Sequence, residues 1–301
     1  MWWGRRRPPR GVDGVEWREL GAAERDAVVD LSEVCAVADG ARRAEPTGGW
    51  VGMDRCVGVG GFAGGQLVAA VTVRSWLQRP TVEGYVHPAW RGRGLGGAIL
   101  DWGLARGGGA HADVETGVLT AGAQLLFESR GLRLVAAMER LSRPVGRAVE
   151  VAPVPAGITF AEWDADDGYD VYAEAFADRP DNPFAYLETP GQTRMAWRGV
   201  VETQGRVQEW SLLARDAEGW AVGLVVCDDD GPFHFGTVPD WRGRGLGLAM
   251  VTEAISRVPA DPGRTDPWQL AVNTENTAAV RLLRRAGYES DGREGHFRPH
   301  R

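Results

Sequence analysis

The chain of 301 residues contains no lysine, because all 34 of its basic residues are arginine. A phosphate-binding loop of the Walker type requires Gly-Lys-Ser or Gly-Lys-Thr, so an ordinary P-loop nucleotidase is excluded. Isoleucine and asparagine are also scarce. All three amino acids have AT-rich codons, so the bias indicates a GC-rich bacterial genome. The abundance of arginine therefore needs no functional explanation.

Cysteine is nearly absent too. Cys35, Cys56 and Cys227 lie far apart, form no Cys-x-x-Cys motif and leave an odd count. A disulfide framework or a structural zinc site is therefore not expected, and a reducing cytoplasm is the default location. Each cysteine is predicted to be a small buried residue without a catalytic role. The five histidines show no metal-ligand spacing, so we expect no bound metal.

The sequence also lacks the run of about 20 apolar residues that a membrane helix needs. Residues 1–10 are basic but precede no apolar stretch, so they are not expected to form a secretory signal. The formal net charge is −7, which argues against nucleic acid as the main partner, since duplex binding relies on basic residues. We expect neither a membrane nor a nucleic-acid partner.

The chain does contain an internal repeat. The seven residues Trp90–Gly96, WRGRGLG, recur unchanged 151 positions later as Trp241–Gly247. Half a chain is too long a period for a solenoid, so the repeat indicates two copies of one domain. Each copy follows a short predicted strand, Val82–His87 or Phe233–Val238, and precedes a helix with one apolar face.

The flanking sequence predicts the same order of elements in both halves: strand, helix, hairpin, strand, glycine-rich turn, helix, strand, helix and strand. This order indicates the α/β class with a mixed sheet, present as two tandem domains. A segment with three prolines separates the halves. We expect a disordered tail at residues 1–14, domains at 15–143 and 158–301, and a linker at 144–157.

A strand that runs into Arg-x-x-Gly-x-Gly and then a helix suits an anion. Glycine lets the backbone approach a ligand, and the N–H groups of the first helical turn point into one space at the positive end of the helix dipole. The arginines add charge-assisted contacts. The spacing differs from the Rossmann fingerprint, and the turn follows about four strands rather than the first. The alternative is a tight surface turn that binds no ligand. Two identical copies in matching strand-turn-helix contexts argue against this alternative.

These residues resemble the acyl-CoA loop of the GNAT superfamily of N-acetyltransferases. Val86 and Pro88 before the first loop fit the usual end of the family's fourth strand. In the second half, residues 270–276 and the Gly287-Tyr288 pair look like its second signature. The resemblance covers nearly the whole chain, twice. Two such domains in tandem are similar to a group of actinobacterial acetyltransferases.

The resemblance implies acetyl-CoA as cosubstrate, wedged between the fourth and fifth strands of a splayed sheet, with no metal. The pyrophosphate would lie on the two loops and the pantetheine arm beside strand backbone. The cofactor-binding residues so implied are Val86, Arg91, Gly92, Arg93, Gly94, Leu95, Gly96, Val238, Arg242, Gly243, Arg244, Gly245, Leu246, Gly247, Asn273 and Asn276.

The family often uses a tyrosine in its last helix to protonate the leaving thiolate. The corresponding residues here are Phe127 and Leu283, and neither can donate a proton. The candidate bases are Glu83 and His234, which occupy matching positions on the fourth strand of each half. A histidine has a pKa near neutrality, whereas a glutamate needs burial to raise its pKa. Alternatively, they are an exposed strand glutamate and a histidine packed in the core.

The resemblance therefore implies an acetyl-CoA-dependent N-acetyltransferase acting on a primary amine of a small molecule by direct attack, as a cytoplasmic monomer or homodimer. The C-terminal half is slightly favoured as catalyst, because the asparagines of the second signature occur only there. Since both tyrosines are missing, the alternative is an inactive acyl-CoA-binding sensor or scaffold. Transfer of another acyl group, or to a protein amine, also remains open.

Overall fold

The computed structural model describes residues 9, 12–41, 56–75, 79–179, 190–199, 209–228, 231–259 and 267–300. The chain forms two compact units, which we call unit 1 (residues 1–139 and 291–301) and unit 2 (residues 140–290). These units differ from the contiguous domains expected at 15–143 and 158–301. Most of the tail expected at residues 1–14 lies outside the described residues.

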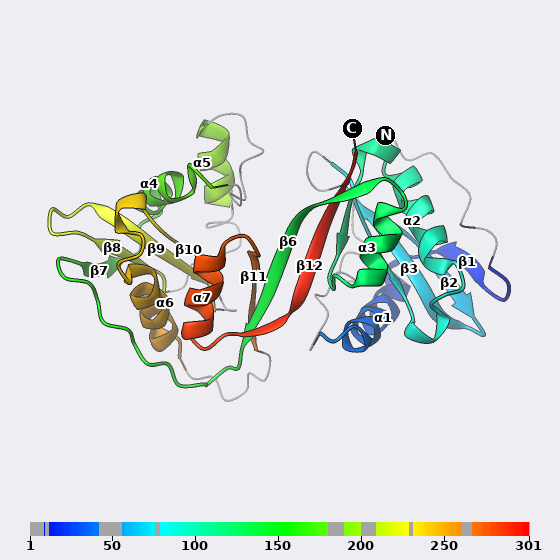
Figure 1. Cartoon of the computed structure of the whole chain (residues 1–301), viewed down its shortest axis with the longest axis horizontal. Coiled ribbons are helices and arrows are strands. Elements are labelled where there is room, and N and C mark those ends of the chain that lie inside the picture. Colours follow the sequence, from blue (N-terminus) through cyan, green and yellow to red (C-terminus); the bar gives the residue numbers. More distant parts are fainter. Residues whose placement is uncertain are drawn as a thin grey trace. The chain divides into compact units, whose positions relative to one another are not determined.

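Unit 1 is built on a mixed sheet with the strand order β1-β2-β3-β4-β5-β12-β6 (Figure 1). The strands from β1 to β4 pair antiparallel, and β4 then pairs with β5 in parallel. Its elements are β1 (Glu16–Glu19), α1 (Arg25–Ala38), β2 (Cys56–Ala63), β3 (Gln66–Arg74), β4 (Thr81–Val86), α2 (Leu95–Arg106), β5 (Asp113–Thr116), α3 (Ala121–Glu128), β6 (Leu132–Arg143) and β12 (Glu289–Pro299).

Helices α1 and α2 cover opposite faces of this sheet. Neighbouring residues of a strand point to opposite faces, and two neighbours on β4 contact different helices. A Cβ atom built on Gly84 of β4 would lie 3.0 Å from Ile99 of α2. The neighbouring Tyr85 packs instead against the apolar cluster that contains Leu31 and Cys35 of α1. Side chains from both faces of β4 are therefore enclosed, and β4 carries the first glycine loop at its end.

Strand β12 joins unit 1 although most of unit 2 precedes it in the sequence. It pairs antiparallel with β5, Phe297 facing Val114. Asp113 of β5 is only 5% exposed, and its carboxylate accepts hydrogen bonds from Arg298 of β12 at 2.7 and 3.0 Å. Arg79 also donates to Asp113, at 2.8 Å, and Nε2 of His296 lies 3.1 Å away. Burial alone would raise the pKa of Asp113, but these three partners lower it to about 2.

Unit 2 contains a four-stranded antiparallel sheet with the order β10-β9-β8-β7 (Figure 1). Strand β11 is hydrogen-bonded to β6, whose last four residues, 140–143, belong to unit 2. The elements of unit 2 are β7 (Thr159–Glu162), α4 (Ala165–Phe176), α5 (Pro190–Arg198), β8 (Leu212–Arg215), β9 (Ala221–Asp228), β10 (Gly231–Thr237), α6 (Leu246–Arg257), β11 (Trp268–Asn273) and α7 (Thr277–Arg285). Helix α5 has no counterpart in the predicted order of elements.

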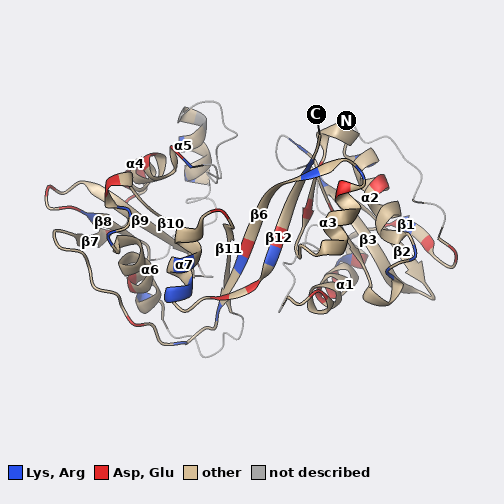
Figure 2. Cartoon of the chain, viewed as in Figure 1, with Lys and Arg blue, Asp and Glu red and all other residues tan. Residues whose placement is uncertain are grey.

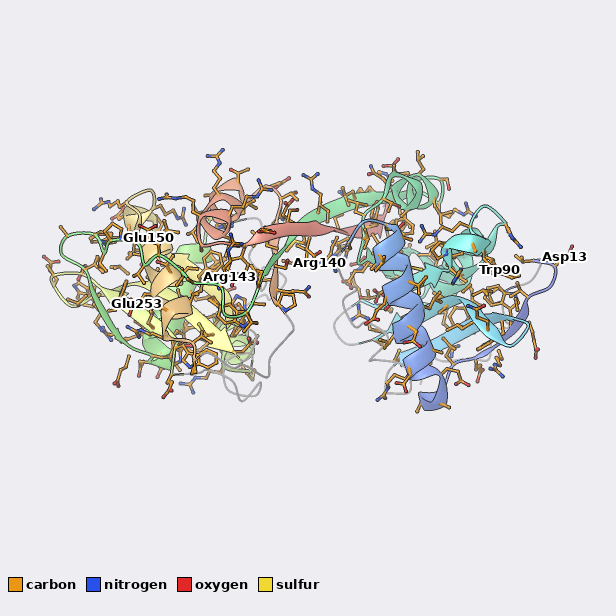
Figure 3. The ribbon with its side chains drawn as sticks, turned by 90° about the horizontal axis from the view of Figure 1, so that it is seen from below. Asp13, Trp90, Arg140, Arg143, Glu150 and Glu253 are labelled. Carbon is orange, nitrogen blue, oxygen red and sulfur yellow. The ribbon has the colours of Figure 1, made fainter. Side chains whose placement is uncertain are left out.

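The segment expected as a linker, residues 144–157, is part of unit 2. Buried Arg143 donates hydrogen bonds to the carbonyls of Arg147, Ala148 and Ala286, so it holds the start of this segment and the end of α7 together (Figure 3). The backbone N–H of Ala152 donates to the Thr252 hydroxyl of α6 at 3.0 Å. Among the described residues, no helix is both long and apolar enough to cross a bilayer.

Candidate functional site

The two glycine loops have the same backbone geometry. Gly94 and Gly245 are the N-cap residues of α2 and α6, and both have φ 86° and ψ −6°. Gly92 and Gly243 also have positive φ, at 76° and 73°. A Cβ atom at any of these four positions would meet nothing within 4 Å. Glycine is therefore required for the left-handed backbone and leaves open space above each loop.

This space faces the beginning of a helix. The first N–H groups of a helix have no acceptor within it, and the helix dipole adds a partial positive charge there. The third glycine of each loop, Gly96 or Gly247, lets α3 or α7 pack closely against the start of α2 or α6. A Cβ atom at Gly96 would lie 3.2 Å from Leu126 of α3, and one at Gly247 would lie 2.9 Å from Leu282 of α7. Each loop is therefore suited to an anion such as a pyrophosphate.

The first arginine of each loop is held by a carboxylate at the end of the unit's first helix. Arg91 makes two hydrogen bonds to Asp39, at 2.5 and 2.9 Å. Arg242 makes two to Asp178, at 3.0 and 2.9 Å. Each pair links the loop to the helix on the opposite face of the sheet, and each raises the pKa of its arginine. Sequence reasoning missed Asp39 and Asp178.

The second arginine of each loop lies over the loop's own tryptophan. The guanidinium carbon of Arg93 is 4.5 Å from the ring centroid of Trp90, and that of Arg244 is 5.0 Å from Trp241 (Figure 3 labels Trp90). Such cation–π contacts orient a guanidinium without neutralising its charge. Arg93 and Arg244 thus keep a positive charge beside each loop.

The pocket of unit 1 has a volume of about 370 Å³. It begins at the loop, where Arg91, Gly92 and Gly96 line it, and extends between β4 and β5. These strands pair only at Thr81–Asp113 and Val82–Val114, and beyond this point they diverge. The pocket lies in this divergence, with its lining completed by Cys35, Val71, Val82, Gly84, Tyr85, Val86, Ile99, Leu100, Val114, Glu115, Thr116, Thr120, Gly122, Ala123, Leu126 and Phe127.

The pocket of unit 2, about 340 Å³, is more strongly basic. It lies between the second loop, the end of α4 and helix α7, and no residue of β11 lines it. Four arginines do: Arg179, Arg242, Arg281 and Arg285. Figure 2 shows the basic residues of α7 as a blue band. The glycine loop thus opens onto a pocket lined by four arginines in unit 2 and onto a pocket lined by one arginine, Arg91, in unit 1.

Three of the predicted cofactor residues have other contacts. Asn276 is the N-cap of α7, its side chain accepting from the N–H of Ala279 at 3.1 Å. Thr120 makes the matching cap on α3. Asn273 accepts from the N–H of Glu275 within a turn, and Val238 is buried. Asn276 also lines the pocket of unit 2, whereas Asn273 and Val238 do not.

The two candidate bases lie in different surroundings. Glu83 is 3% exposed, so it is not an exposed strand glutamate. Its Oε1 atom accepts a hydrogen bond of 2.6 Å from the Tyr85 hydroxyl, and its Oε2 atom is 3.7 Å from Arg74. Arg74 also donates to Glu115 at 2.7 Å. Glu83 does not itself line the pocket of unit 1, but Tyr85 and Glu115 do.

His234 is partly buried and packs against two aromatic rings. Its ring centroid is 4.9 Å from that of Phe233 and 6.0 Å from that of Trp197 on α5. Burial lowers the pKa of His234 to about 4, so the imidazole is neutral and weakly basic at pH 7. His234 does not line the described pocket of unit 2, whereas the next residues of β10, Phe235–Thr237, do.

Cys35 lines the pocket of unit 1, which the sequence gave no reason to expect. Its thiol donates to the carbonyl of Val86 at 3.2 Å, and this carbonyl also accepts from Arg91 at 3.1 Å. Burial raises the pKa of Cys35 despite the nearby Arg91, so it remains a thiol at neutral pH. The described residues contain no group of three or more metal-ligating side chains.

A mixed sheet whose central strands diverge beside a glycine loop at a helix N-terminus is the architecture of an acyl-CoA-dependent acyltransferase. The Acetyltransferase (GNAT) family matches residues 163–288. The chain is 33% identical over 216 residues to a mycothiol acetyltransferase of Clavibacter sepedonicus, covering 67% of each protein. The chain belongs to the GNAT family of N-acetyltransferases.

Solved structures extend the similarity to both halves. A GCN5-related N-acetyltransferase from Sphaerobacter thermophilus is 26% identical, with a TM-score of 0.73 over 95% of both chains. A tandem GNAT protein from the clavulanic acid biosynthesis pathway has a TM-score of 0.64 over 94% of this chain and 97% of its own, at 18% identity. The predicted fold of two tandem GNAT domains is confirmed.

Proposed function

We propose that the protein transfers the acetyl group of acetyl-CoA to a primary amine of a small molecule, and that unit 1 carries the reaction. The observation that carries the proposal is the course of the unit 1 pocket, which runs from the anion-binding loop into the divergence between β4 and β5. A pyrophosphate on the loop would let the pantetheine arm extend between these strands. The thioester would then lie near Tyr85 and Glu115.

The surroundings of the candidate bases support unit 1 over the C-terminal half that the sequence favoured. Glu83 is a buried carboxylate joined to the pocket by the Tyr85 hydroxyl. His234 is packed against Trp197 and Phe233, and its lowered pKa of about 4 makes it a poor proton acceptor. Unit 2 keeps a cationic pocket suited to the phosphates of CoA.

Three observations support a small molecule as the acceptor. The pocket of unit 1, at about 370 Å³, is within the size range of small-molecule sites, so beside the acetyl end of the cosubstrate it suits only a small acceptor. The polar residues of this lining near the diverging strands are Tyr85, Glu115 and Thr116. They can accept hydrogen bonds from an amine and can donate hydrogen bonds to, or accept them from, its neighbouring hydroxyl groups. The mycothiol acetyltransferases among the relatives are named for a small-molecule reaction as well.

The test is release of free CoA thiol from acetyl-CoA in the presence of a panel of primary amines: an amino sugar, a polyamine and an amino acid amide. Mass spectrometry of the product identifies the acetylated nitrogen. We expect turnover with at least one acceptor, lowered about a hundredfold by Glu83→Gln and less than threefold by His234→Ala.

The two substitutions also separate the alternatives. A large loss from His234→Ala with a small loss from Glu83→Gln would assign the reaction to unit 2. Binding of acetyl-CoA without thiol release, for every amine in the panel, would favour the inactive sensor or scaffold.

A further inference from the structure

Acetyl transfer to an amine moves one proton from nitrogen to sulfur, and unit 1 needs a group that handles it. The residue at the family's tyrosine position is Phe127, which lines the pocket and packs edge-on against Phe297 at 4.8 Å. A phenyl ring can neither accept nor donate this proton. The residue that accepts and donates this proton must therefore lie elsewhere on the lining of the pocket.

Tyr85 has the required placement. It lines the same pocket as the loop and the diverging strands, and its hydroxyl donates to Oε1 of Glu83 at 2.6 Å. A distance this short is typical of a charge-assisted hydrogen bond between a hydroxyl and a carboxylate. Glu83 is 3% exposed and does not itself line the pocket. Tyr85 thus belongs to the pocket lining and is hydrogen-bonded to a buried carboxylate.

We propose that Tyr85 is a catalytic residue of unit 1, relaying a proton from the acceptor amine to the carboxylate of Glu83 and back to the leaving thiolate. This inference rests on the proposed function. In the first step the neutral amine nitrogen bonds to the thioester carbon and loses a proton to the Tyr85 oxygen, while the phenol proton moves to Glu83. The carbon–sulfur bond then breaks with its electron pair on sulfur.

In the second step the same groups act in reverse. Glu83 returns its proton to the Tyr85 oxygen, and the phenol proton passes to the thiolate. The products are an amide and the CoA thiol, and both side chains are in their starting states. One pair thus serves as base and as acid, so no separate proton donor at Phe127 is needed.

Other charged and titratable side chains surround this pair in the described part of unit 1. Arg74 on β3 lies 3.7 Å from Glu83 and stabilises its carboxylate form, and Glu115 on β5 shares that arginine. Cys35 lies on α1, beside Arg91 of the loop, and Cys56 lies on β2. Arg74 thus places a positive charge beside the Glu83 carboxylate, whose ionised form the first proton transfer requires.

The described part of β10 in unit 2 lacks the tyrosine of this pair. Gly236 takes the place of Tyr85, since the loops superpose with this offset. A Cβ atom at Gly236 would lie 3.2 Å from both Ala175 and Phe176 of α4. Because α4 packs directly on this strand position, a tyrosine there would require Ala175 and Phe176 to shift. Among the described residues, the Glu83–Tyr85 pair therefore has no equivalent on β10.

The test is the substitution Tyr85→Phe, which keeps the ring and removes the hydroxyl. With acetyl-CoA and the best amine of the panel above, we expect kcat to fall about a hundredfold while KM for acetyl-CoA changes less than threefold. Tyr169→Phe is the matched control, because it removes a phenol hydroxyl from the buried part of unit 2. This control is expected to retain kcat.

Glu83→Gln and the double variant complete the cycle. Because a relay works only when both groups are present, the double variant should lose no more than the stronger single variant. Unchanged thermal melting and acetyl-CoA affinity separate this loss from misfolding. A Tyr85→Phe variant as active as the unaltered chain, or losses that multiply in the double variant, would overturn the relay alone. No acetyl transfer by the unaltered chain to any amine would overturn the proposed function with it.

Discussion

The two units share a glycine loop and the contacts of its arginines, but they differ in the pockets beside the loop. The loops have the same sequence and the same N-cap dihedral angles, and in each the first arginine is held by a carboxylate. Beyond the loop, residues of both β4 and β5 line the unit 1 pocket, whereas β10 but no residue of β11 lines the unit 2 pocket. Anion binding requires the backbone geometry of the loop, and the surrounding side chains are free to diverge.

The difference between the pockets lies on one strand in each unit. In β4 the side chains of Glu83 and Tyr85 point to the same face and form a hydrogen-bonded pair. The corresponding residues of β10 are His234, with a lowered pKa, and Gly236. Two residue differences on one strand face thus separate the proposed proton path of unit 1 from the unit 2 pocket, which is lined by four arginines.

The largest effect is expected from filling the space above one loop. Gly94→Glu and Gly245→Glu each put a residue with a side chain at a position with left-handed backbone angles. Each also places a carboxylate where the pyrophosphate would lie. Each substitution should weaken acetyl-CoA binding in its own unit at least a hundredfold. Calorimetry would then show the loss of one binding site from the acetyl-CoA stoichiometry. Amine acetylation should be lost with Gly94→Glu and retained with Gly245→Glu. The opposite pattern would assign the reaction to unit 2.

A second prediction concerns stability and should affect unit 1 only. Asp113→Asn removes the charge that holds Arg79, Arg298 and His296, so we expect unfolding free energy to fall by about 3 kcal/mol. The contribution of Asp113 is present above the pKa of an unfolded aspartate, near 4, and is lost as pH falls towards 2. Urea titrations at pH 7 and pH 2.5 should therefore differ less in the variant than in the unaltered chain.

The control for this substitution lies in unit 2. Asp166 also binds two arginines, Arg194 and Arg198, but it is 61% exposed. Asp166→Asn should leave the urea midpoint almost unchanged, because exposed ion pairs contribute little. Equal losses from both substitutions would show that burial of Asp113 is not the cause.

The smallest effect is expected from the carboxylates that hold the loops. Asp39→Asn should weaken acetyl-CoA binding in unit 1 about fivefold, because Arg91 loses its charged partner and the loop loses its link to α1. Asp178→Asn should have a smaller effect in unit 2, since Asp178 is 61% exposed and Asp39 only 17%. Calorimetry measures both, and Asp39→Glu tests rescue. A stronger effect at Asp178 would contradict this ranking.

Much of the fold was predictable because it depends on local patterns. The repeated loop, the strands that precede it and the helices that follow it are all present. Gly131 and Gly287 follow helices α3 and α7, and both have the positive φ that is common just after a helix end. Strand β12 was not predictable in the same way, since the sequence order gives no sign that residues 291–299 join the first sheet rather than the second.

The candidate site was less predictable, because it depends on contacts between distant segments. Asp39 and Asp178 follow different helices and are not related by the offset between the loops, so the repeat could not reveal them. The surroundings of His234 depend on Trp197 from a helix that the sequence did not suggest. Tyr85 was within reach of sequence reasoning, since it lies two residues from Glu83 and strand side chains alternate.

The placement of β12 has a consequence for biosynthesis. Unit 1 needs residues 291–301 to complete its sheet, and these are made after all of unit 2. At about 5–20 residues per second, the ribosome takes on the order of ten seconds to reach them after residue 139. During this time the edge of β5 remains unpaired and Asp113 lacks Arg298. The half that is synthesised first is therefore the half that matures last.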